Sequence, residues 1–356
     1  MLPTSFPNTL HRPAAFALYR LPHADSFTRI EGEVLQFPSC SLLNGVTGFV
    51  VAPFDVQADQ PIVVIRPDRT MQVPLDAPCQ SSGVPLTASG DISPDYHIDF
   101  ANFHAQLEMG TFRKIVLARC ADEQPVDVEP EELFLRACQL YPRMFIALVQ
   151  TPQSGMWLTA TPEILLEGIG DEWRTIALAG TMKLEGEQLT GEGETLTWSI
   201  KNIEEQRIVA TYIAECLEQF TSDFREEGPR TVRAANLVHL RSDFTFTLPA
   251  DRGIGSLLQT LHPTPAVCGL PKRAAFDFIV HHEHTPRRYY SGFMGPLSMD
   301  GSTHLYVSLR CMSIDDAGFH LYAGGGLLKN STEEQEWQET EAKLETMRRC
   351  IAIKRM

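Results

Sequence analysis

The chain lacks long apolar runs, clusters of basic residues and closely spaced cysteine pairs. No apolar stretch approaches the roughly 20 residues that span a bilayer, and the N-terminus has no basic-then-apolar signal pattern. Because no long basic run accompanies the formal net charge of −15, a nucleic-acid partner is not expected. We therefore expect a cytoplasmic protein that binds neither membranes nor nucleic acid.

The spacing of the cysteines also restricts the kinds of disulfide or metal site that the chain is expected to contain. The eight cysteines are scattered along the chain, and no Cys-x-x-Cys pair occurs. Such spacing favours reduced thiols over a disulfide framework or a zinc site. What the chain does contain is apolar material: 43% of its 356 residues are hydrophobic, which is ample for a large core.

Two regions of the chain differ in their pattern. Residues 1–95 are punctuated by proline and contain short strand-like runs, and residues 81–94 are predicted to form a loop. Residues 96–356 contain consecutive strand-like segments with only occasional helices, which argues against a parallel βαβ repeat. Helices are predicted over residues 98–108, 129–141, 198–220 and 333–353.

Two ionisable residues border apolar segments. Lys114 opens a strand-like run, and as a catalytic base it needs a pKa lowered by burial or by cations such as Arg119 and Arg310. The alternative is an exposed lysine at a strand end. Glu163 follows a proline and precedes an apolar run, so burial is expected to raise its pKa and to suit it to general acid catalysis. Its alternative is a solvated glutamate.

Carboxylates recur on two of the predicted helices. Glu205 lies near the start of one, whereas Glu336 and Glu339 share a face of the last helix, which Lys343 continues. This spacing is typical of an exposed helix with an intrahelical Glu–Lys pair, and it also suits oxygen ligands for Mg²⁺. Glu341 lies about 200° around the axis from Glu339, so we expect it to face away and to tolerate substitution.

Several polar or glycine residues are candidates for anion binding. The run Gly324–Gly326 resembles no phosphate loop, and it offers either backbone N–H groups to a carboxylate or a tight turn. Arg310 is a candidate bidentate partner for a carboxylate, with a structural ion pair as the alternative. His239 alternates with apolar residues, as a core histidine does. Three clustered histidines lack the spacing of a helical zinc motif and are interpreted as helix-end residues: His281, His282 and His284.

The order of the motifs over residues 96–350 resembles that of the chorismate-utilising enzymes and, within them, the isochorismate synthases. The resemblance rests on Lys114-Ile-Val-Leu-Ala-Arg119, Thr161-Pro-Glu163, Ala177-Leu-Ala-Gly-Thr181, Lys201-Asn-Ile-Glu-Glu205, His239-Leu240, Leu261-His-Pro-Thr-Pro-Ala-Val267, Tyr290-Ser-Gly292, Arg310, Ala323-Gly-Gly-Gly326 and Glu336-Trp-Gln-Glu-Thr340.

This resemblance implies a fold. It implies a single large α/β (α+β) domain with packed, mainly antiparallel β-sheets surrounded by helices. Residues 1–95 would form a variable N-terminal portion of that fold, and residues 96–356 the chorismate-binding catalytic region.

The resemblance also implies a Mg²⁺-dependent isomerase that adds water at C2 of chorismate with loss of the C4 hydroxyl. Lys114 would activate the water, and Glu163 would protonate the departing hydroxyl. Glu205 and Glu339 would bind Mg²⁺ directly, and Glu336 would support its waters. The residues implied to bind substrate are Thr181, His239, Gly292, Arg310, Gly324, Gly325 and Lys343.

Lys114 separates subfamilies, because the related synthases that use ammonia typically lack a lysine there. We therefore expect no glutamine amidotransferase partner, and a monomer or weak homodimer because no coiled-coil seam occurs. Two alternatives stay open: a salicylate synthase, which continues to pyruvate elimination, and a degenerate binding module without activity. The destination of isochorismate, menaquinone or siderophore biosynthesis, also stays open.

Overall fold

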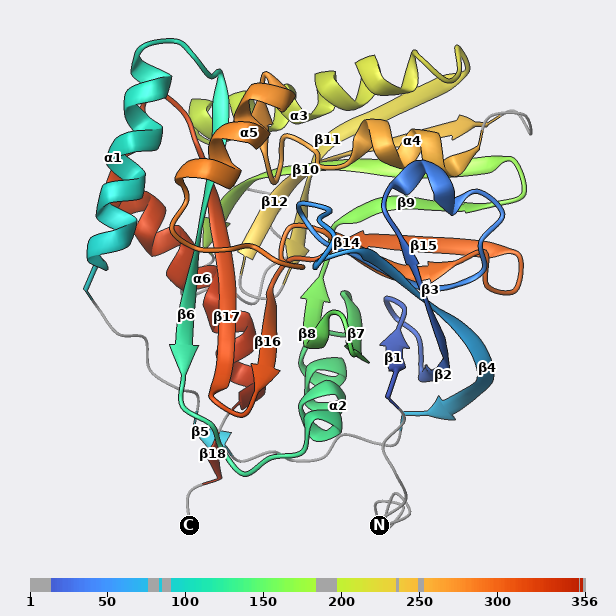
Figure 1. Ribbon diagram of the computed structural model, residues 1–356. Coiled ribbons are helices and arrows are strands. Elements are labelled where there is room, and N and C mark those ends of the chain that lie inside the picture. The colour runs from blue at the N-terminus through green and yellow to red at the C-terminus, as the bar shows by residue number, and fades with distance from the viewer. Residues whose placement is uncertain are drawn as a thin grey trace.

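A single antiparallel sheet dominates the computed structural model of the chain. The sheet contains sixteen strands, and every pairing between them is antiparallel within the described residues. It folds into two layers whose strands cross (Figure 1). The predicted α+β fold with packed antiparallel sheets is therefore confirmed, with both layers belonging to one sheet. The structure describes residues 14–75, 83–84, 91–183, 197–234, 237–248, 253–351 and 353–354.

The strands follow one another across the sheet in an order that differs from the chain order. The first layer contains β11 (Phe224–Ala234), β12 (Leu237–Thr247), β10 (Glu172–Lys183), β9 (Ile164–Ile169), β15 (Ser302–Val307), β14 (Phe293–Leu297), β3 (Gly48–Ala52) and β4 (Ile62–Pro74). The second contains β2 (Ser26–Phe37), β1 (Phe16–Arg20), β7 (Phe145–Thr151), β8 (Gly155–Thr161), β16 (Cys311–Asp315), β17 (Gly318–Leu327), β6 (Lys114–Glu123) and β13 (Gly269–Leu270). A separate pair joins β5 (Gly83–Val84) to β18 (Ile353–Lys354).

The sheet passes from one layer to the other where β2 pairs with β4. A register shift between Glu31 and Gly32 marks a β-bulge, which bends both strands. A Cβ on Gly32 would lie 1.8 Å from the carbonyl oxygen of Arg66, so the close approach requires glycine. The bend moves β4 from one apolar core to another. Val64 packs in the core on the outer face of the first layer, and Val73 packs against the core on the outer face of the second layer.

Helices cover both outer faces of the folded sheet. Phe49, Trp157 and Tyr306 belong to the apolar cluster between the layers. Within the described residues, no helix is both long and apolar enough to cross a membrane. The first layer is covered by α3 (Ile200–Leu217), α4 (Ile254–Leu261) and the 3₁₀-helix η1 (Cys40–Leu43), the second by α2 (Pro130–Leu140) and α6 (Glu333–Ile351), and the flank of β6 by α1 (Pro94–Glu108) and α5 (Lys272–His282).

All four predicted helices are present, as α1, α2, α3 and α6. Strands β15 and β16 are separated at Arg310, which has a φ of +47°. The predicted loop over 81–94 lies largely outside the described residues, and its last residue, Pro94, begins α1. The histidines His281 and His282 end α5, which confirms their interpretation as helix-end residues.

Candidate active site

A cavity lies between the two layers and receives side chains from both. Its empty space, counted together with the open solvent at its mouth, is about 620 Å³. Val116 of β6 and the 266–267 turn form part of its wall. Seven of the predicted site residues line it: Glu163, Thr181, Glu205, His239, Arg310, Gly324 and Lys343.

Lys114 is fully buried at the start of β6, so the alternative of an exposed strand-end lysine is wrong. Its Nζ lies 2.9 Å from Glu205 Oε1. A Cβ on Gly326 would lie 2.7 Å from Lys114 Cε and 2.2 Å from Glu205 Oε1, so glycine is needed to leave room for this pair. Arg119 does not act on Lys114 as predicted. It points to the other face of β6, where it binds Thr340 and forms an ion pair with Glu341.

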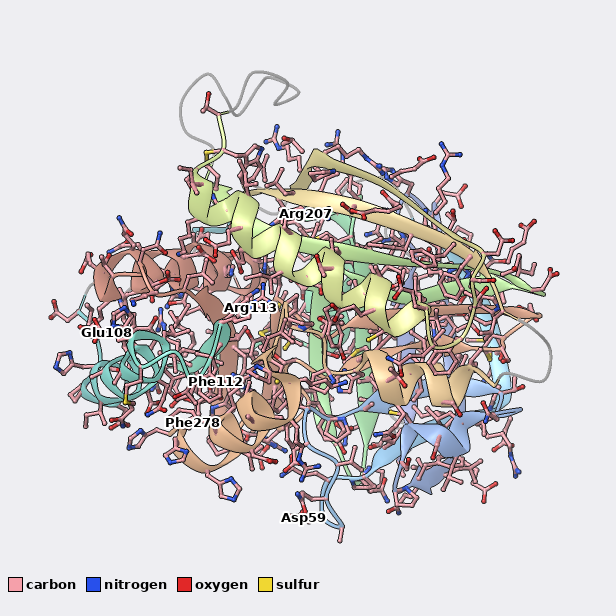
Figure 2. The ribbon with its side chains drawn as sticks, turned by 90° about the horizontal axis from the view of Figure 1, so that it is seen from above. Asp59, Glu108, Phe112, Arg113, Arg207 and Phe278 are labelled. Atoms are coloured by element: carbon pink, nitrogen blue, oxygen red, sulfur yellow. The ribbon has the colours of Figure 1, made fainter. Side chains whose placement is uncertain are left out.

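The start of β6 is held by the flanking helices. Phe112 packs edge-on against Phe278 of α5, with ring centroids 5.3 Å apart (Figure 2). Further along, Arg287 and Glu283 form a buried ion pair beside the strand. The Arg287 guanidinium donates to the carbonyl oxygen of Val116 at 2.8 Å. These contacts fix the strand that carries Lys114.

Glu163 lies in the connection between β8 and β9 and is only 4% exposed. Burial raises the pKa of its carboxyl group to about 7, although Lys114 and Arg310 oppose that shift. The predicted direction is therefore confirmed. Because a carboxyl group with such a pKa carries its proton part of the time at neutral pH, Glu163 is able to act as a general acid.

His239 and Arg310 form a buried pair in the cavity wall. His239 Nδ1 donates to the carbonyl oxygen of Gly180 at 3.1 Å, and Nε2 accepts from Arg310 Nη2 at 3.0 Å. Burial and the neighbouring guanidinium lower the pKa of His239 well below its usual value, so the ring is neutral. Within the described part of the chain, Arg310 Nη1 is buried without a hydrogen-bond partner. It is available to a carboxylate of a ligand.

Each predicted metal-binding carboxylate forms an ion pair with a lysine. Glu205 pairs with Lys114, and Glu339 Oε1 lies 2.6 Å from Lys343 Nζ. Burial opposes ionisation of Glu205, but the contact with Lys114 outweighs it and lowers the pKa of Glu205. Lys343 also donates to the carbonyl oxygen of Gly324 at 2.8 Å. The negative charge is thus compensated within the protein itself.

The third pair joins Glu336 of α6, which is 1% exposed, to Lys201 of α3. Burial and the nearby Glu339 raise the pKa of Glu336. The fields of Glu336, Glu339 and Glu205 all raise the pKa of Lys201, against the effect of burial. Lys201 thus lies within the field of all three carboxylates. Sequence reasoning missed Lys201, although its place four residues before Glu205 on one helix was a usable signal.

The glycine run lies within strand β17, so the alternative of a tight turn is wrong. A Cβ on Gly325 would lie 2.9 Å from Glu336 Oε2, which places Gly325 against the carboxylates of α6. Gly292 is elsewhere: a Cβ there would lie 1.9 Å from the carbonyl oxygen of Ala52. We therefore assign Gly292 to strand packing and correct its predicted place in the substrate site. Tyr290, which sequence reasoning did not select, lines the cavity instead.

Glu341 faces away from the cavity, and its ion pairs argue against the predicted tolerance of substitution. It forms ion pairs with Arg119 and, at 2.7 Å, with Arg348. Its side chain is 11% exposed, and that of Arg348 is 2% exposed. Removing the charge of Glu341 would leave two largely buried arginines without their shared partner.

The chain is similar in sequence to proteins of a known enzyme family. The sequence profile described as "Chorismate binding enzyme" matches residues 87–352. The chain is 32% identical over 280 residues to a salicylate biosynthesis isochorismate synthase of Pseudomonas aeruginosa, covering 76% of this chain and 58% of that protein. It is 33% identical over 250 residues to the isochorismate synthase MenF of Escherichia coli K12, covering 68% of this chain and 57% of MenF.

The chain therefore spans less than two thirds of the length of these two relatives. The fold is also similar to a solved structure of the menaquinone-specific isochorismate synthase MenF from Escherichia coli. That match has a TM-score of 0.80 at 23% identity and covers 95% of this chain and 89% of the other.

Proposed function

The chain belongs to the chorismate-binding enzyme family, and we propose that it is an isochorismate synthase that requires Mg²⁺. The observation that carries this proposal is the proximity of two buried groups: Glu163 lines the cavity, and Lys114, paired with Glu205 of the cavity wall, is close enough to act on Glu163 electrostatically. A buried lysine and a glutamic acid with a raised pKa are the base and acid that an exchange of hydroxyl groups requires. Isochorismate would feed menaquinone or siderophore biosynthesis, and the protein would act in the cytoplasm.

In this proposal the residues divide the reaction into two proton transfers. Lys114 accepts a proton from a water molecule as the water oxygen bonds to C2 of chorismate. Glu163 donates its proton to the C4 hydroxyl, which departs as water while both ring double bonds shift. One water enters and one leaves, so the reaction is an isomerisation. No ammonia is consumed, and we therefore propose that the enzyme works without a glutamine amidotransferase.

The carboxylates of α3 and α6 suit a hard divalent cation. Glu205, Glu336 and Glu339 supply oxygen donors, as Mg²⁺ prefers. Glu336 Oε2 is buried and has no hydrogen-bond partner among the described residues, as expected for an atom that serves an absent ligand. Bound Mg²⁺ would neutralise the ring carboxylate of chorismate and hold it in place. Glu205 and Glu339 would bind the ion, and Glu336 would hold its waters.

Substrate binding would use the positive and polar groups of the cavity wall. The free Nη1 of Arg310 and the ammonium of Lys343 are suited to a carboxylate of chorismate. His239, held neutral by burial and by the neighbouring Arg310, would position the substrate together with Thr181. Gly324 and Gly325 would allow the ligand to approach strand β17 closely.

The proposal predicts the product directly. Purified protein incubated with chorismate and Mg²⁺ should form isochorismate, and chelation of the metal should abolish the reaction. Chromatography with mass detection identifies the product. Salicylate and pyruvate as the main products would favour the salicylate synthase alternative, and full activity after exhaustive chelation would contradict the Mg²⁺ requirement.

Lys201 should compete with Mg²⁺, because its ammonium lies within the field of all three carboxylates. We expect Lys201→Met to lower the dissociation constant for Mg²⁺ roughly tenfold, since one competing cation is removed and the apolar stem is kept. Calorimetric titration without substrate measures this. Lys329→Met, which removes an exposed lysine, is the matched control and should change nothing. Weaker Mg²⁺ binding in Lys201→Met would mean that Lys201 holds Glu336 in place instead.

Glu339 and Glu341 should have separate effects although they lie two residues apart. Glu339→Gln should raise the Mg²⁺ concentration needed for activity steeply, because a charged oxygen ligand becomes neutral. Glu341→Gln should leave that concentration unchanged but lower the free energy of unfolding by about 3 kcal/mol, because it breaks a largely buried ion-pair network. Mg²⁺ titration of activity and urea unfolding of both variants provide the test. Coincident Mg²⁺ curves would show that the metal-binding face of α6 is wrongly assigned.

A further inference from the structure

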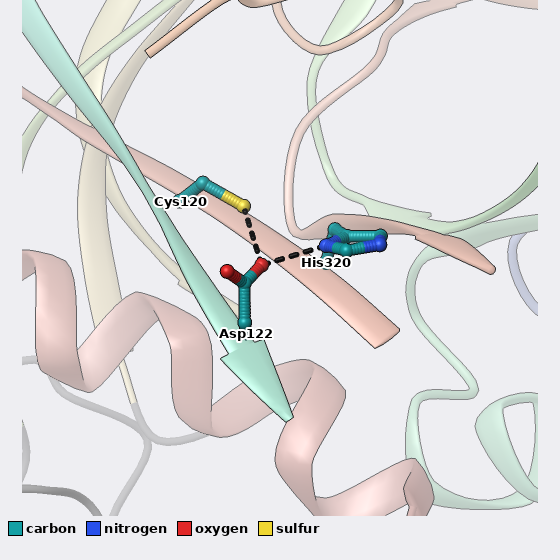
Figure 3. Close-up of side chains that lie close together, drawn as sticks. All are labelled: Cys120, Asp122 and His320. Atoms are coloured by element: carbon teal, nitrogen blue, oxygen red, sulfur yellow. Dashed lines mark hydrogen bonds and ion pairs between the residues drawn. The ribbon is translucent and has the colours of Figure 1, made fainter. Parts of the chain in front are cut away.

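A second group of metal-ligating side chains lies outside the cavity, on β6 and β17. The sulfur of Cys120, a carboxylate oxygen of Asp122 and a ring nitrogen of His320 all lie within 4.8 Å of one another, the one such group among the described residues. Figure 3 shows the three side chains converging on Asp122. We infer that they form a binding site for a borderline transition-metal ion such as Zn²⁺.

Strand register explains the convergence. Cys120 and Asp122 are two residues apart on β6 and therefore share a face, and His320 lies directly opposite Asp122 on β17. Asp122 Oδ1 lies 3.7 Å from Cys120 Sγ and 2.6 Å from His320 Nδ1. Ligand atoms about 2.0–2.3 Å from one tetrahedral ion are roughly 3.3–3.8 Å apart. The sulfur and the carboxylate are already so spaced, and the ring needs to withdraw from Asp122 by roughly 1 Å.

The donor atoms determine the class of ion. A thiolate and an imidazole favour zinc and other borderline metals, whereas Mg²⁺ prefers oxygen ligands only. The site therefore differs in chemistry from the three carboxylates Glu205, Glu336 and Glu339 of α3 and α6. The side chain of Asp122 is 77% exposed and that of His320 is 25% exposed, so an ion can enter from solvent and keep water as its fourth ligand.

A carboxylate beyond these ligands holds the histidine in the required orientation. Asp315, at the end of β16, has both carboxylate oxygens 3.2 Å from His320 Nε2. An imidazole that binds a metal through one nitrogen typically donates its other N–H group to a carboxylate, which fixes the ring and the tautomer. Asp315 thus leaves Nδ1 of His320 directed at Asp122, where the ion would bind.

Metal binding would change the proton content of the site. Burial raises the pKa of the Cys120 thiol to about 12, so the metal-free group is protonated. Coordination forms a sulfur–metal bond and releases the thiol proton to solvent. The proton shared by His320 Nδ1 and Asp122 is also released, because the ion takes its place between the two atoms. The ion itself is neither oxidised nor reduced.

The expected consequence is a clamp between two strands that carry the catalytic cavity. Cys120 lies six residues from Lys114 on β6, roughly 20 Å away, so the ion would not enter the cavity. It would tie β6 to β17, the strand that contains Gly324–Gly326. We therefore expect Zn²⁺ to raise the thermal unfolding temperature even when Mg²⁺ is present in excess.

Titration of the full chain with ZnCl₂ in Mg²⁺-containing buffer tests the site. One Zn²⁺ per chain should bind, and Co²⁺ in its place should give the charge-transfer absorption of a thiolate ligand. Cys120→Ser should abolish that absorption, and His320→Gln should weaken Zn²⁺ binding at least as much. Asp315→Asn, which removes only the supporting carboxylate, should weaken it about 10–100-fold.

Two exposed residues provide matched controls. His282→Gln and Asp316→Asn remove a histidine and an aspartate outside the group and should leave Zn²⁺ binding unchanged. Thermal melts of every variant without metal check that folding is intact. Absence of stoichiometric Zn²⁺ binding would overturn the inference. Binding that survives in both Cys120→Ser and His320→Gln would overturn it as well, because the ion would then lie elsewhere.

Discussion

Glu163→Gln is expected to lower the turnover of chorismate by about 10²–10⁴-fold, the usual contribution of a positioned general acid. Glutamine keeps the shape of the buried side chain but has no proton to give to the departing hydroxyl. Mg²⁺ binding should be unchanged, since Glu163 is not among the proposed ligands. Steady-state kinetics and calorimetry on the same preparation measure both quantities.

The pH dependence of activity separates this role from a structural one. Because burial raises the pKa of Glu163 to about 7, the acid loses its proton as pH rises through this value, and activity should fall with it. Carboxylates of bound substrate would shift this fall in activity to higher pH, since nearby negative charge disfavours ionisation of Glu163. Glu167→Gln, on the following strand, is the control and should keep both the wild-type turnover and the wild-type pH dependence. Wild-type turnover in Glu163→Gln would remove Glu163 from the mechanism.

Lys114→Ala should abolish water addition, again by about 10²–10⁴-fold, while chorismate and Mg²⁺ still bind. The variant also leaves Glu205 without its buried partner, so a loss of stability is expected alongside the loss of turnover. A second variant is needed to separate the two effects.

Lys114→Arg provides that separation. Arginine keeps the positive charge beside Glu205 but does not deprotonate in proteins, so it cannot serve as a base. If Lys114 is the base, Lys114→Arg is inactive although it unfolds at a higher temperature than Lys114→Ala. If Lys114 is only a counter-ion for Glu205, Lys114→Arg recovers activity, and the assignment fails.

The fold class and the site motifs could be predicted because they are local in sequence or carried by a family resemblance. The helices α1, α2, α3 and α6 show periodic apolar patterns, and many strands show short apolar runs. The short helix α4 was missed, because 8 residues give few repeats of a helical pattern, and of α5 only the histidines at its end were assigned to a helix. The bend at Gly32 was missed because it depends on contact with a strand some thirty residues away.

The site could be predicted only in part, because a sequence does not show which side chains from distant segments pair with one another. The sequence indicated the proposed acid, base and carboxylates, but it could not assign each carboxylate to one lysine or place Arg119 on the opposite face of β6. It also led us to expect no zinc site, since cysteine spacing was the only signal considered. Cys120 and His320 are 200 residues apart, and strand pairing alone brings them together.

The central claim is that solvent water adds to C2 as the C4 hydroxyl leaves, and isotope labelling tests it most directly. The enzyme would be incubated with chorismate and Mg²⁺ in water enriched in oxygen-18, and the product would be analysed by mass spectrometry. Attack by solvent water gives isochorismate that carries one solvent-derived oxygen at C2. Isochorismate that retains only the original oxygen atoms would contradict it, because the hydroxyl would then have migrated within the ring without attack by water.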